Sequence, residues 1–372
     1  MLSHFDAIQQ SPRLGDILVP ERNSFGALRC LMASLVLISH SFLFTSGTSA
    51  TEPMTALTGW SLGEHAVQFF FLMSGLMVAQ SLDRSRSAAD FLLARALRIF
   101  PALIVCVVLT AFVLGPLVSD YSLAHYFKSK ELPLYVLKTL GLVTGSAPLP
   151  GVFSDVPLAD HVNSSLWTLK YEAICYGVLA LAGLAGLMRH QKSGAALITA
   201  GLLALTVFVS SPARPEDYGF ADNIRYFVLF FTPGVLAYLM RDKLVITGWL
   251  LLPAFGLLVM LFDTGFKELA TALFEGYLAL WLATKTLGPV RGFCNRADLS
   301  YGIYIFAAPI QQVAIASVAG IGPFAVMAIG FTVAVPLAAL SWALIERPAM
   351  KARPRIRRAL AAFFDRPDHR IA

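Results

Sequence analysis

The chain has 372 residues, of which 57% are hydrophobic and only 14% are charged, and its mean hydropathy is strongly positive. This composition excludes an ordinary soluble domain, which could not cover so much apolar surface with polar side chains. The net charge of +6 does not call for nucleic acid, because the basic residues gather in short loops and at the C-terminal end. The sequence therefore predicts an all-α, polytopic integral membrane protein.

The first 25 residues are polar, contain Pro12 and Pro20, and carry both signs of charge. They lack the short apolar core of a signal peptide, so we expect a cytoplasmic N-terminal lead-in over residues 1–25. The four cysteines stand singly in or beside apolar runs, without the paired spacing of a metal site. They predict neither disulfides nor a bound metal.

Residues 26–345 form the expected transmembrane domain, because apolar runs near the roughly 20 residues needed to cross a bilayer recur through it. We expect about ten transmembrane helices, at 26–45, 65–81, 99–119, 166–188, 194–211, 223–241, 245–262, 267–287, 299–318 and 322–345.

The distribution of lysine and arginine predicts that both termini are cytoplasmic. With this orientation, 22 of the 29 basic residues lie in the N-terminal lead-in, the inner loops and the tail over residues 346–372. The tail, with its "RPAMKARPRIRR" segment, is expected to contact anionic membrane lipids. Residues 120–165 would form an external loop, in which the apolar stretch 132–145 is either interfacial or re-entrant.

Arg29 and His40 lie eleven residues apart in the first apolar run. Eleven residues advance a helix by about 1100°, roughly 20° past three full turns, so the two side chains share a face. The rise of about 16 Å places Arg29 at the inner headgroups and His40 in the outer half of the membrane. Buried ionisable groups usually serve a function, although a histidine bonded to a neighbouring helix is the structural alternative.

Glu172 lies about six residues into the segment "SLWTLKYEAICY", or about 10 Å below the outer surface. His40 is predicted at nearly the same depth, so we expect the two to meet. A histidine paired with a carboxylate can act as a general base with an orienting partner. The alternative is a structural pair between two helices.

Two further motifs lie deeper along the predicted path. Ser74 and Gly75, in "QFFFLMSGLMVAQ", are small residues near the middle of the second span, where a ligand chain or a helix could approach closely. Arg95 and Arg98 share a helix face at the inner mouth of the third span and could grip a phosphate. Helix packing and anchoring at the inner surface are the respective alternatives.

The motifs "FGALRCLMASLVLISH", "FFFLMSG", "LLARALRIFPAL", "SLWTLKYEAICY", "LSYGIYIFAAPIQQ" and "LIERPAMK", in this order, resemble the membrane acyltransferase-3 family of bacterial carbohydrate O-acyltransferases. The resemblance covers about residues 22–353. It implies an O-acyltransferase, most simply an O-acetyltransferase, of the bacterial inner membrane. Acetyl-CoA or another acyl-CoA would be the donor, and an exported or cell-surface carbohydrate, such as an exopolysaccharide, would be the acceptor.

The resemblance also implies roles for single residues. His40 would be the catalytic base, supported by Glu172 and Arg29. Arg95 and Arg98 would bind the coenzyme A phosphates. The remaining expected contacts are Ser74, Gly75 and Phe71 with the donor, and Trp167, Asn163 and Tyr171 with the acceptor.

The sequence leaves several alternatives open. A transporter or flippase of a lipid-linked saccharide would also need buried ionisable groups, and a binding or scaffold protein of polysaccharide assembly is a second rival. The carbohydrate, its attachment to a lipid, oligomer formation, and direct transfer against an acyl-histidine intermediate stay undecided. So does the choice between an acetyl and a succinyl group, whose carboxylate Lys170 could meet.

Overall fold

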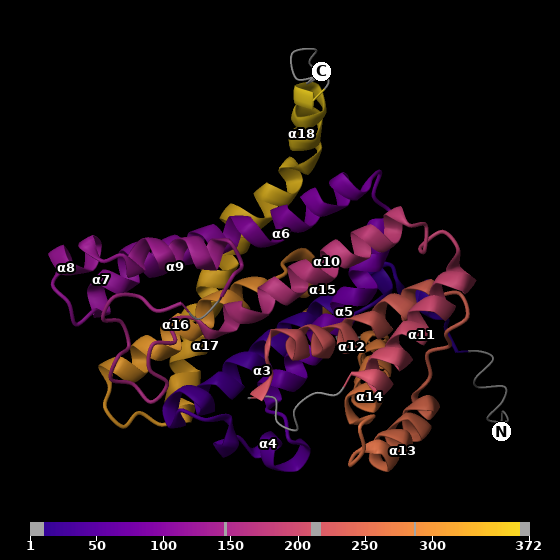
Figure 1. Ribbon diagram of the computed structural model, residues 1–372, viewed down its shortest axis with the longest axis horizontal. Coiled ribbons are helices and arrows are strands. Elements are labelled where there is room, and N and C mark those ends of the chain that lie inside the picture. The colour runs from indigo at the N-terminus through magenta and orange to yellow at the C-terminus, as the bar shows by residue number, and fades with distance from the viewer. Residues whose placement is uncertain (1–10, 145–146, 210–216, 286–287, 365–372) are drawn as a thin grey trace.

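The computed structural model describes residues 11–144, 147–209, 217–285 and 288–364, and its regular secondary structure in these ranges consists of helices (Figure 1). Its only β-type pairings within them are two isolated bridges, Arg13 with Val245 and Ser119 with Val152. The all-α prediction is therefore confirmed for the described part of the chain.

Most of the elements follow one another with short connections, whereas a long segment joins α9 to η4. In chain order they are α2 (Leu14–Ile17), η1 (Pro20–Arg22), α3 (Phe25–Ser46), η2 (Ser49–Thr51), α4 (Pro53–Thr58), α5 (Leu62–Asp83), α6 (Ala88–Leu109), η3 (Thr110–Leu114), α7 (Gly115–Val118), α8 (Leu123–Lys128), α9 (Glu131–Leu140), η4 (Ser164–Thr168), α10 (Leu169–Leu184), α11 (Gln191–Phe208), α12 (Phe220–Leu239), η6 (Gly248–Leu250), α13 (Leu251–Leu261), α14 (Lys267–Ala283), α15 (Pro289–Arg296), α16 (Ser300–Ser317), α17 (Pro323–Ser341), η7 (Trp342–Glu346) and α18 (Arg347–Phe364).

The centre of the bundle consists of α3, α5, α12 and α16, with α17 packed on α16 (Figure 1). Glycines bring α5 and α12 into close contact. A Cβ atom on Gly75 would lie 2.0 Å from the carbonyl oxygen of Phe231, and one on Gly234 would lie 2.1 Å from that of Leu72. No larger residue fits at either position without separating the two helices.

A second group of helices, α6, α10 and α18, covers one side of this centre. Helix α17 passes into α18 through the π-helical turn η7, and α18 projects from the body of the molecule in Figure 1. Two contacts hold the junction against α6: Glu346 in η7 accepts from Arg98 at 2.8 Å, and Asp90 accepts from Arg353 at 2.8 Å.

A helix occurs at each of the ten predicted spans, but by length and apolar composition only five of the described helices could cross a membrane. A sixth qualifies if α15 and α16, which meet at 83°, form one broken span. The others fall short for physical reasons: α13 has only 11 residues, and α14 carries three charged groups. The ten-span count and the cytoplasmic side of both termini stay predictions. The five qualifying helices are Phe25–Ser46, Leu62–Asp83, Ala88–Val118, Gln191–Phe208 and Pro323–Leu360.

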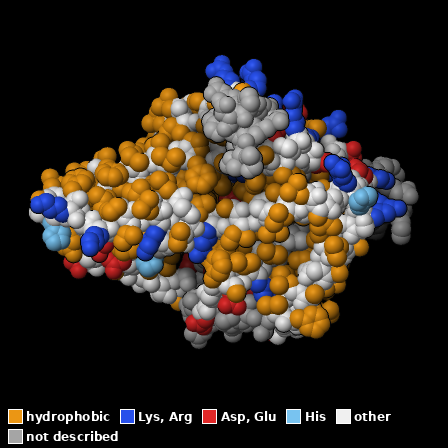
Figure 2. Space-filling view, turned by 45° about the horizontal axis from the view of Figure 1, so that its top comes forward, with side chains coloured by type: hydrophobic (Ala, Val, Ile, Leu, Met, Phe, Trp, Pro, Cys, Tyr) orange, Lys and Arg blue, Asp and Glu red, His pale blue; other side chains and the backbone are white. Residues whose placement is uncertain are grey.

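The surface agrees with a membrane setting. Hydrophobic side chains cover most of the face shown in Figure 2, and lysines and arginines gather at its margins. Exposed leucine, valine and phenylalanine side chains occur on α6, α11, α13 and α17. The predicted interfacial or re-entrant stretch forms α9, which packs beside α6 and exposes Leu134 and Leu137.

Parts of several predicted segments lie outside the described residues. These are residues 1–10 of the lead-in, 145–146 of the external loop, 210–211 of the fifth span, 286–287 of the eighth span and 365–372 of the basic tail.

Candidate active site

Two pockets lie in line inside the bundle. The two are named the inner and the outer pocket after the predicted orientation of the chain. The inner pocket is lined by Arg29, Ser74, Arg95, Arg98, Glu172 and Tyr176, among others, and has about 100 Å³ of free space. The outer pocket is lined by Ser39, His40, Glu64, Trp167, Asn223 and Tyr226, among others, and has about 530 Å³. The side chains of Val67 and Tyr304 line both, so the two pockets are neighbours along the bundle.

One face of α5 runs through both pockets. Glu64 and Val67 line the outer pocket, and Val67, Phe71, Ser74 and Val78 line the inner one. The spacing of three or four residues is that of a single helix face. Helix α3 behaves similarly, since Arg29 lines the inner pocket and His40 the outer one, as their predicted shared face requires.

Two of the three inner arginines are held by carboxylates. Asp298 Oδ2 accepts from Arg29 Nη1 and from Arg98 Nη2, both at 2.8 Å. Arg98 Nη1 also donates to Glu346 Oε2 at 2.8 Å, and Glu346 is only 1% exposed. Ser300 completes the cluster by donating its hydroxyl and its backbone N–H to Asp298 Oδ1. The charges of Arg29 and Arg98 are therefore already balanced within the protein.

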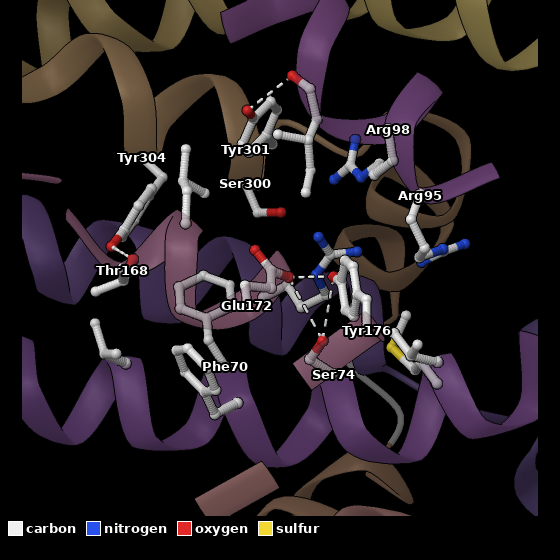
Figure 3. Close-up of a pocket in the computed structure, with 17 residues that line it drawn as sticks. Phe70, Ser74, Arg95, Arg98, Thr168, Glu172, Tyr176, Ser300, Tyr301 and Tyr304 are labelled. Carbon is white, nitrogen blue, oxygen red and sulfur yellow. Dashed lines mark hydrogen bonds between the residues drawn. The ribbon is translucent and has the colours of Figure 1, made fainter. Parts of the chain in front are cut away.

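Arg95 differs from its two neighbours. Among the described residues it forms no ion pair; its Nη2 lies 3.3 Å from the hydroxyl of Ser81, and its Nε is buried without a hydrogen-bond partner. The guanidinium lies over the ring of Tyr176, 5.9 Å from the ring centre (Figure 3). A guanidinium with unused donors at the edge of a pocket is suited to an anionic ligand.

Glu172 belongs to the inner pocket. Its Oε1 accepts a hydrogen bond from Tyr176, one helical turn further along α10, and the hydroxyl of Ser74 on α5 lies 3.5 Å away (Figure 3). No hydrogen bond joins Glu172 to His40 among the described residues, and His40 lines the other pocket. The predicted direct contact between His40 and Glu172 is therefore not seen in the described structure, and their catalytic roles stay predictions.

The placement of Glu172 follows from where α10 begins. Helix α10 starts at Leu169, and the 3-10 turn η4 before it is already buried, with Ser165 at 1% and Thr168 at 4% exposure. The carboxylate of Glu172 lines the same pocket as the three arginines, whereas His40 lines the neighbouring pocket.

His40 lies at the wall of the outer pocket. Its half-buried ring packs against Phe44, with 5.0 Å between ring centres, and its Nδ1 has no hydrogen-bond partner among the described residues. The carboxylate that lines the same pocket is Glu64, in the first turn of α5. Glu64 Oε2 accepts from the backbone N–H and the hydroxyl of Ser61, which fixes the side chain through a capping box.

Aromatic side chains make up much of the outer wall. Trp167 and Phe227 pack against each other with 5.4 Å between ring centres, and Tyr218 and Tyr226 approach within 5.9 Å. The hydroxyl of Tyr218 donates to Glu268 at 2.7 Å. Burial and this hydrogen bond raise the pKa of Tyr218, so the phenol stays protonated.

The boundary between the pockets contains a hydrogen-bonded pair. The hydroxyls of Thr168 and Tyr304 lie 2.6 Å apart (Figure 3), and Val67 reaches the same level from α5. A ligand that extended from the inner pocket to His40 would have to pass between Val67 and Tyr304.

The remaining predicted residues divide between the pockets and the packing of the bundle. Phe71 and Ser74 line the inner pocket and Trp167 the outer one. Gly75 is not a lining residue in the described structure, because it faces the backbone of α12. Its predicted contact with the donor is wrong, and helix packing, the alternative reading, is right.

Asn163 and Tyr171 also serve packing. The amide of Asn163 is fully buried and donates to the carbonyl oxygen of Ile305 at 2.8 Å. The ring of Tyr171 packs on Phe227, with 4.8 Å between centres, and Lys170 lies 4.8 Å above the same tyrosine. Neither Asn163 nor Tyr171 lines the inner or the outer pocket, so their predicted contacts with the acceptor are not seen in the described structure.

Sequence reasoning missed Tyr176, Asp298, Glu346 and Glu64. Tyr176 could have been found, because it lies four residues after Glu172 on the same helix face. Glu64 forms the pattern Ser-x-x-Glu with Ser61 before an apolar run, which is a capping signal and gives no hint of a pocket. Among the described residues no group of three possible metal ligands occurs.

The fold and the pockets define a helical membrane protein with a buried basic site, and comparison with known proteins places it in a family. A family model described as an acyltransferase domain matches residues 22–343, so the chain belongs to the acyltransferase-3 family, as the motifs predicted. No solved structure matches significantly.

Two relatives illustrate the range of the family. The chain is similar to an O-acetyl transferase of Shigella phage Sf6, with 31% identity over 87% of this chain and 95% of the relative. It is also similar to nodulation protein 10 of Rhizobium leguminosarum bv. viciae, with 29% identity over 89% of this chain and 94% of the relative. Together, the family and these relatives support an O-acyltransferase.

Proposed function

We propose that this protein is an O-acyltransferase of the bacterial inner membrane. It transfers an acyl group, most simply acetyl, from an acyl-CoA bound on the cytoplasmic side to a hydroxyl of an exported or cell-surface carbohydrate. The relative named as an O-acetyl transferase supports the choice of acetyl. The observation that carries the proposal is the pair of neighbouring pockets, one lined by an arginine that forms no ion pair with any described residue and the other lined by a histidine.

The donor occupies the inner pocket. Arg95 is the arginine whose charge the described residues leave unpaired, so it holds a phosphate of the coenzyme. Arg98 and Arg29 act as positioning residues, because Asp298 and Glu346 already engage them. The thin pantetheine arm then extends past Ser74 and Phe71 towards the boundary at Val67.

The acyl transfer takes place where the two pockets meet. His40 removes the proton from the attacking hydroxyl as its oxygen bonds to the thioester carbon. The carbon–sulfur bond breaks, and the thiolate receives the proton to leave as free coenzyme A. Transfer through an acyl-histidine uses the same groups in two steps.

Glu172 has a different task from the one the sequence suggested. It accepts from Tyr176, whose ring lies beneath the guanidinium of Arg95. Glu172 is therefore a positioning residue of the donor site, because it holds the tyrosine ring over which the guanidinium of Arg95 lies.

The test is an assay of thiol release by purified protein supplied with acetyl-CoA and a surface polysaccharide extract. We expect release with wild-type protein and none with His40→Ala, because His40 supplies the one imidazole among the described lining residues of the outer pocket. His125→Ala, on the exposed helix α8, is the matched control. Full activity of His40→Ala would refute the assignment, and a flippase would release no thiol in any sample.

A second measurement examines the donor site. Arg95→Gln should weaken acetyl-CoA binding by about 10- to 100-fold, since a charge-assisted hydrogen bond contributes about 1.5–3 kcal/mol. Arg189→Gln, an exposed arginine on the same predicted side of the membrane, should leave affinity unchanged. Unaltered affinity of Arg95→Gln would exclude Arg95 from the phosphate site.

A further inference from the structure

The outer pocket has the size and lining of a site for a sugar ring. Its volume of about 530 Å³ falls within the range of roughly 300–1,000 Å³ that small-molecule sites usually occupy. Trp167, Phe227 and Tyr226 give it aromatic walls, against which the apolar face of a pyranose can pack. The hydroxyls of Tyr218 and Tyr226 are bonded to Glu268 and Gln68, which holds both rings in place.

Polar atoms in the pocket remain without partners. The hydroxyl of Ser165, a residue that is 1% exposed, is buried and forms no hydrogen bond with any described residue, and the same holds for Nδ1 of His40. Glu64 uses Oε2 in its capping box, while Oε1 forms no hydrogen bond within the described structure. Asn223 donates from Nδ2 to Gly219 and leaves its Oδ1 unbonded among the same residues. The unbonded atoms of Ser165 and His40 are buried, and such atoms cost free energy that a ligand with hydroxyls can recover, while Glu64 Oε1 and Asn223 Oδ1 offer further acceptors.

The outer pocket has an acidic lining residue but no basic one among the described residues. Glu64 is the one carboxylate among the described lining residues, and no lysine or arginine lines the pocket within the described ranges. This differs from the inner pocket, where three arginines are present. A ligand group with negative charge would face Glu64 without a compensating cation, and juxtaposed like charges strongly oppose binding.

We infer that the outer pocket accepts an uncharged sugar residue and that Glu64 excludes sugars carrying a carboxylate or phosphate. This inference rests on the proposed function, because it names the class of acceptor at that site. Glu64 Oε1 and Asn223 Oδ1 accept hydrogen bonds from two hydroxyls of the ring. A third hydroxyl then points to His40, where it loses its proton to the imidazole.

The test uses two glycosides that differ only at carbon 6. Methyl β-D-glucopyranoside carries a neutral hydroxymethyl group there, and methyl β-D-glucopyranosiduronate carries a carboxylate. The full chain, held in nanodiscs of uncharged lipid, is titrated with each sugar, and binding is followed by saturation-transfer NMR. We expect the neutral glycoside to bind on the order of tenfold or more tightly than the charged one.

Glu64→Gln separates the role of the charge from that of the fold. Glutamine can also complete a capping box, so the start of α5 is preserved. This variant should reduce the preference for the neutral glycoside to less than about threefold. Glu131→Gln, an exposed residue of α9, is the matched control and should keep the wild-type preference.

Three results would overturn the inference: equal binding of the two glycosides to wild-type protein, binding of neither, or an unchanged preference in Glu64→Gln. The comparison on wild-type protein stands even if the variant does not fold. Thiol release from acetyl-CoA with the polysaccharide extract tests the proposed function separately. A protein that releases thiol but binds both glycosides equally would retain the function and lose the inference.

Discussion

Asp298 is the residue whose removal should most disturb the inner pocket. Its Oδ2 receives hydrogen bonds from Arg29 on α3 and Arg98 on α6, both at 2.8 Å. Asp298→Asn keeps the shape of the side chain and removes its charge. The two guanidinium groups then lose a shared anion and repel each other.

The magnitude follows from burial. Removing one partner of a buried ion pair costs about 3–5 kcal/mol. The side chain of Asp298 is 18% exposed, and Arg98 keeps its second partner Glu346, so we reduce the expected loss of stability to about 2–3 kcal/mol. For a chain of 372 residues, such a loss lowers the midpoint of thermal unfolding by about 3–4 °C.

The assay is thermal unfolding of purified protein in detergent, combined in a double-mutant cycle with Arg29→Gln. We expect the effects of Asp298→Asn and Arg29→Gln to be non-additive by more than about 1 kcal/mol, because each variant breaks the same contact. Additivity within about 0.3–0.5 kcal/mol, or an unchanged midpoint for Asp298→Asn, would show that Asp298 does not hold the arginines.

Two further predictions concern contacts between helices. Gly75→Ala should destabilise the protein by about 1–3 kcal/mol in thermal unfolding, because α5 and α12 must separate. Gly177→Ala, which has open space around it, is the control and should be neutral or slightly stabilising; equal effects of the two variants would contradict the packing role of Gly75. Asp90→Asn should release Arg353 and speed limited proteolysis within α18, with activity loss following cleavage, and wild-type protease resistance would argue against this anchor.

The positions of the helices could be predicted because the apolar runs are long and their limits are marked by turn and capping residues. The all-α class and the helix that contains both Arg29 and His40 followed directly from periodicity. The number of membrane crossings is harder to predict. Helix α12 is apolar on average but contains Asp222 and a buried Arg225, so hydropathy alone cannot place it in lipid.

Contacts between distant parts of the chain could not be predicted. Arg98 contacts Asp298 and Glu346, which are 200 and 248 residues away in the sequence. The local pattern around "ARALRIFP" does not indicate that Arg98 contacts two acidic residues. It also does not indicate that Arg95 contacts no acidic residue among those described. Which arginine is available to a ligand depends on tertiary packing.

The different roles of Ser74 and Gly75 could have been predicted from the sequence. Adjacent residues on a helix point about 100° apart, so Ser74 and Gly75 cannot both face one narrow pocket. The structure turns Ser74 to the pocket and Gly75 to α12. By contrast, the sequence periodicity does not indicate the buried turn η4 that precedes α10. The placement of Glu172 in the pocket of the arginines could therefore not be predicted.

The π-helical turn η7 sets how far α18 is rotated about the helix axis relative to α17. A π turn corresponds to one residue more than an α-helix would hold at that place. Deleting one residue from it would restore regular winding and rotate everything that follows by about 100°. Arg353 would then swing away from Asp90 and Glu346 away from Arg98. A single additional residue thus keeps η7 and the basic C-terminal helix in register with Arg98 and Asp90 of α6.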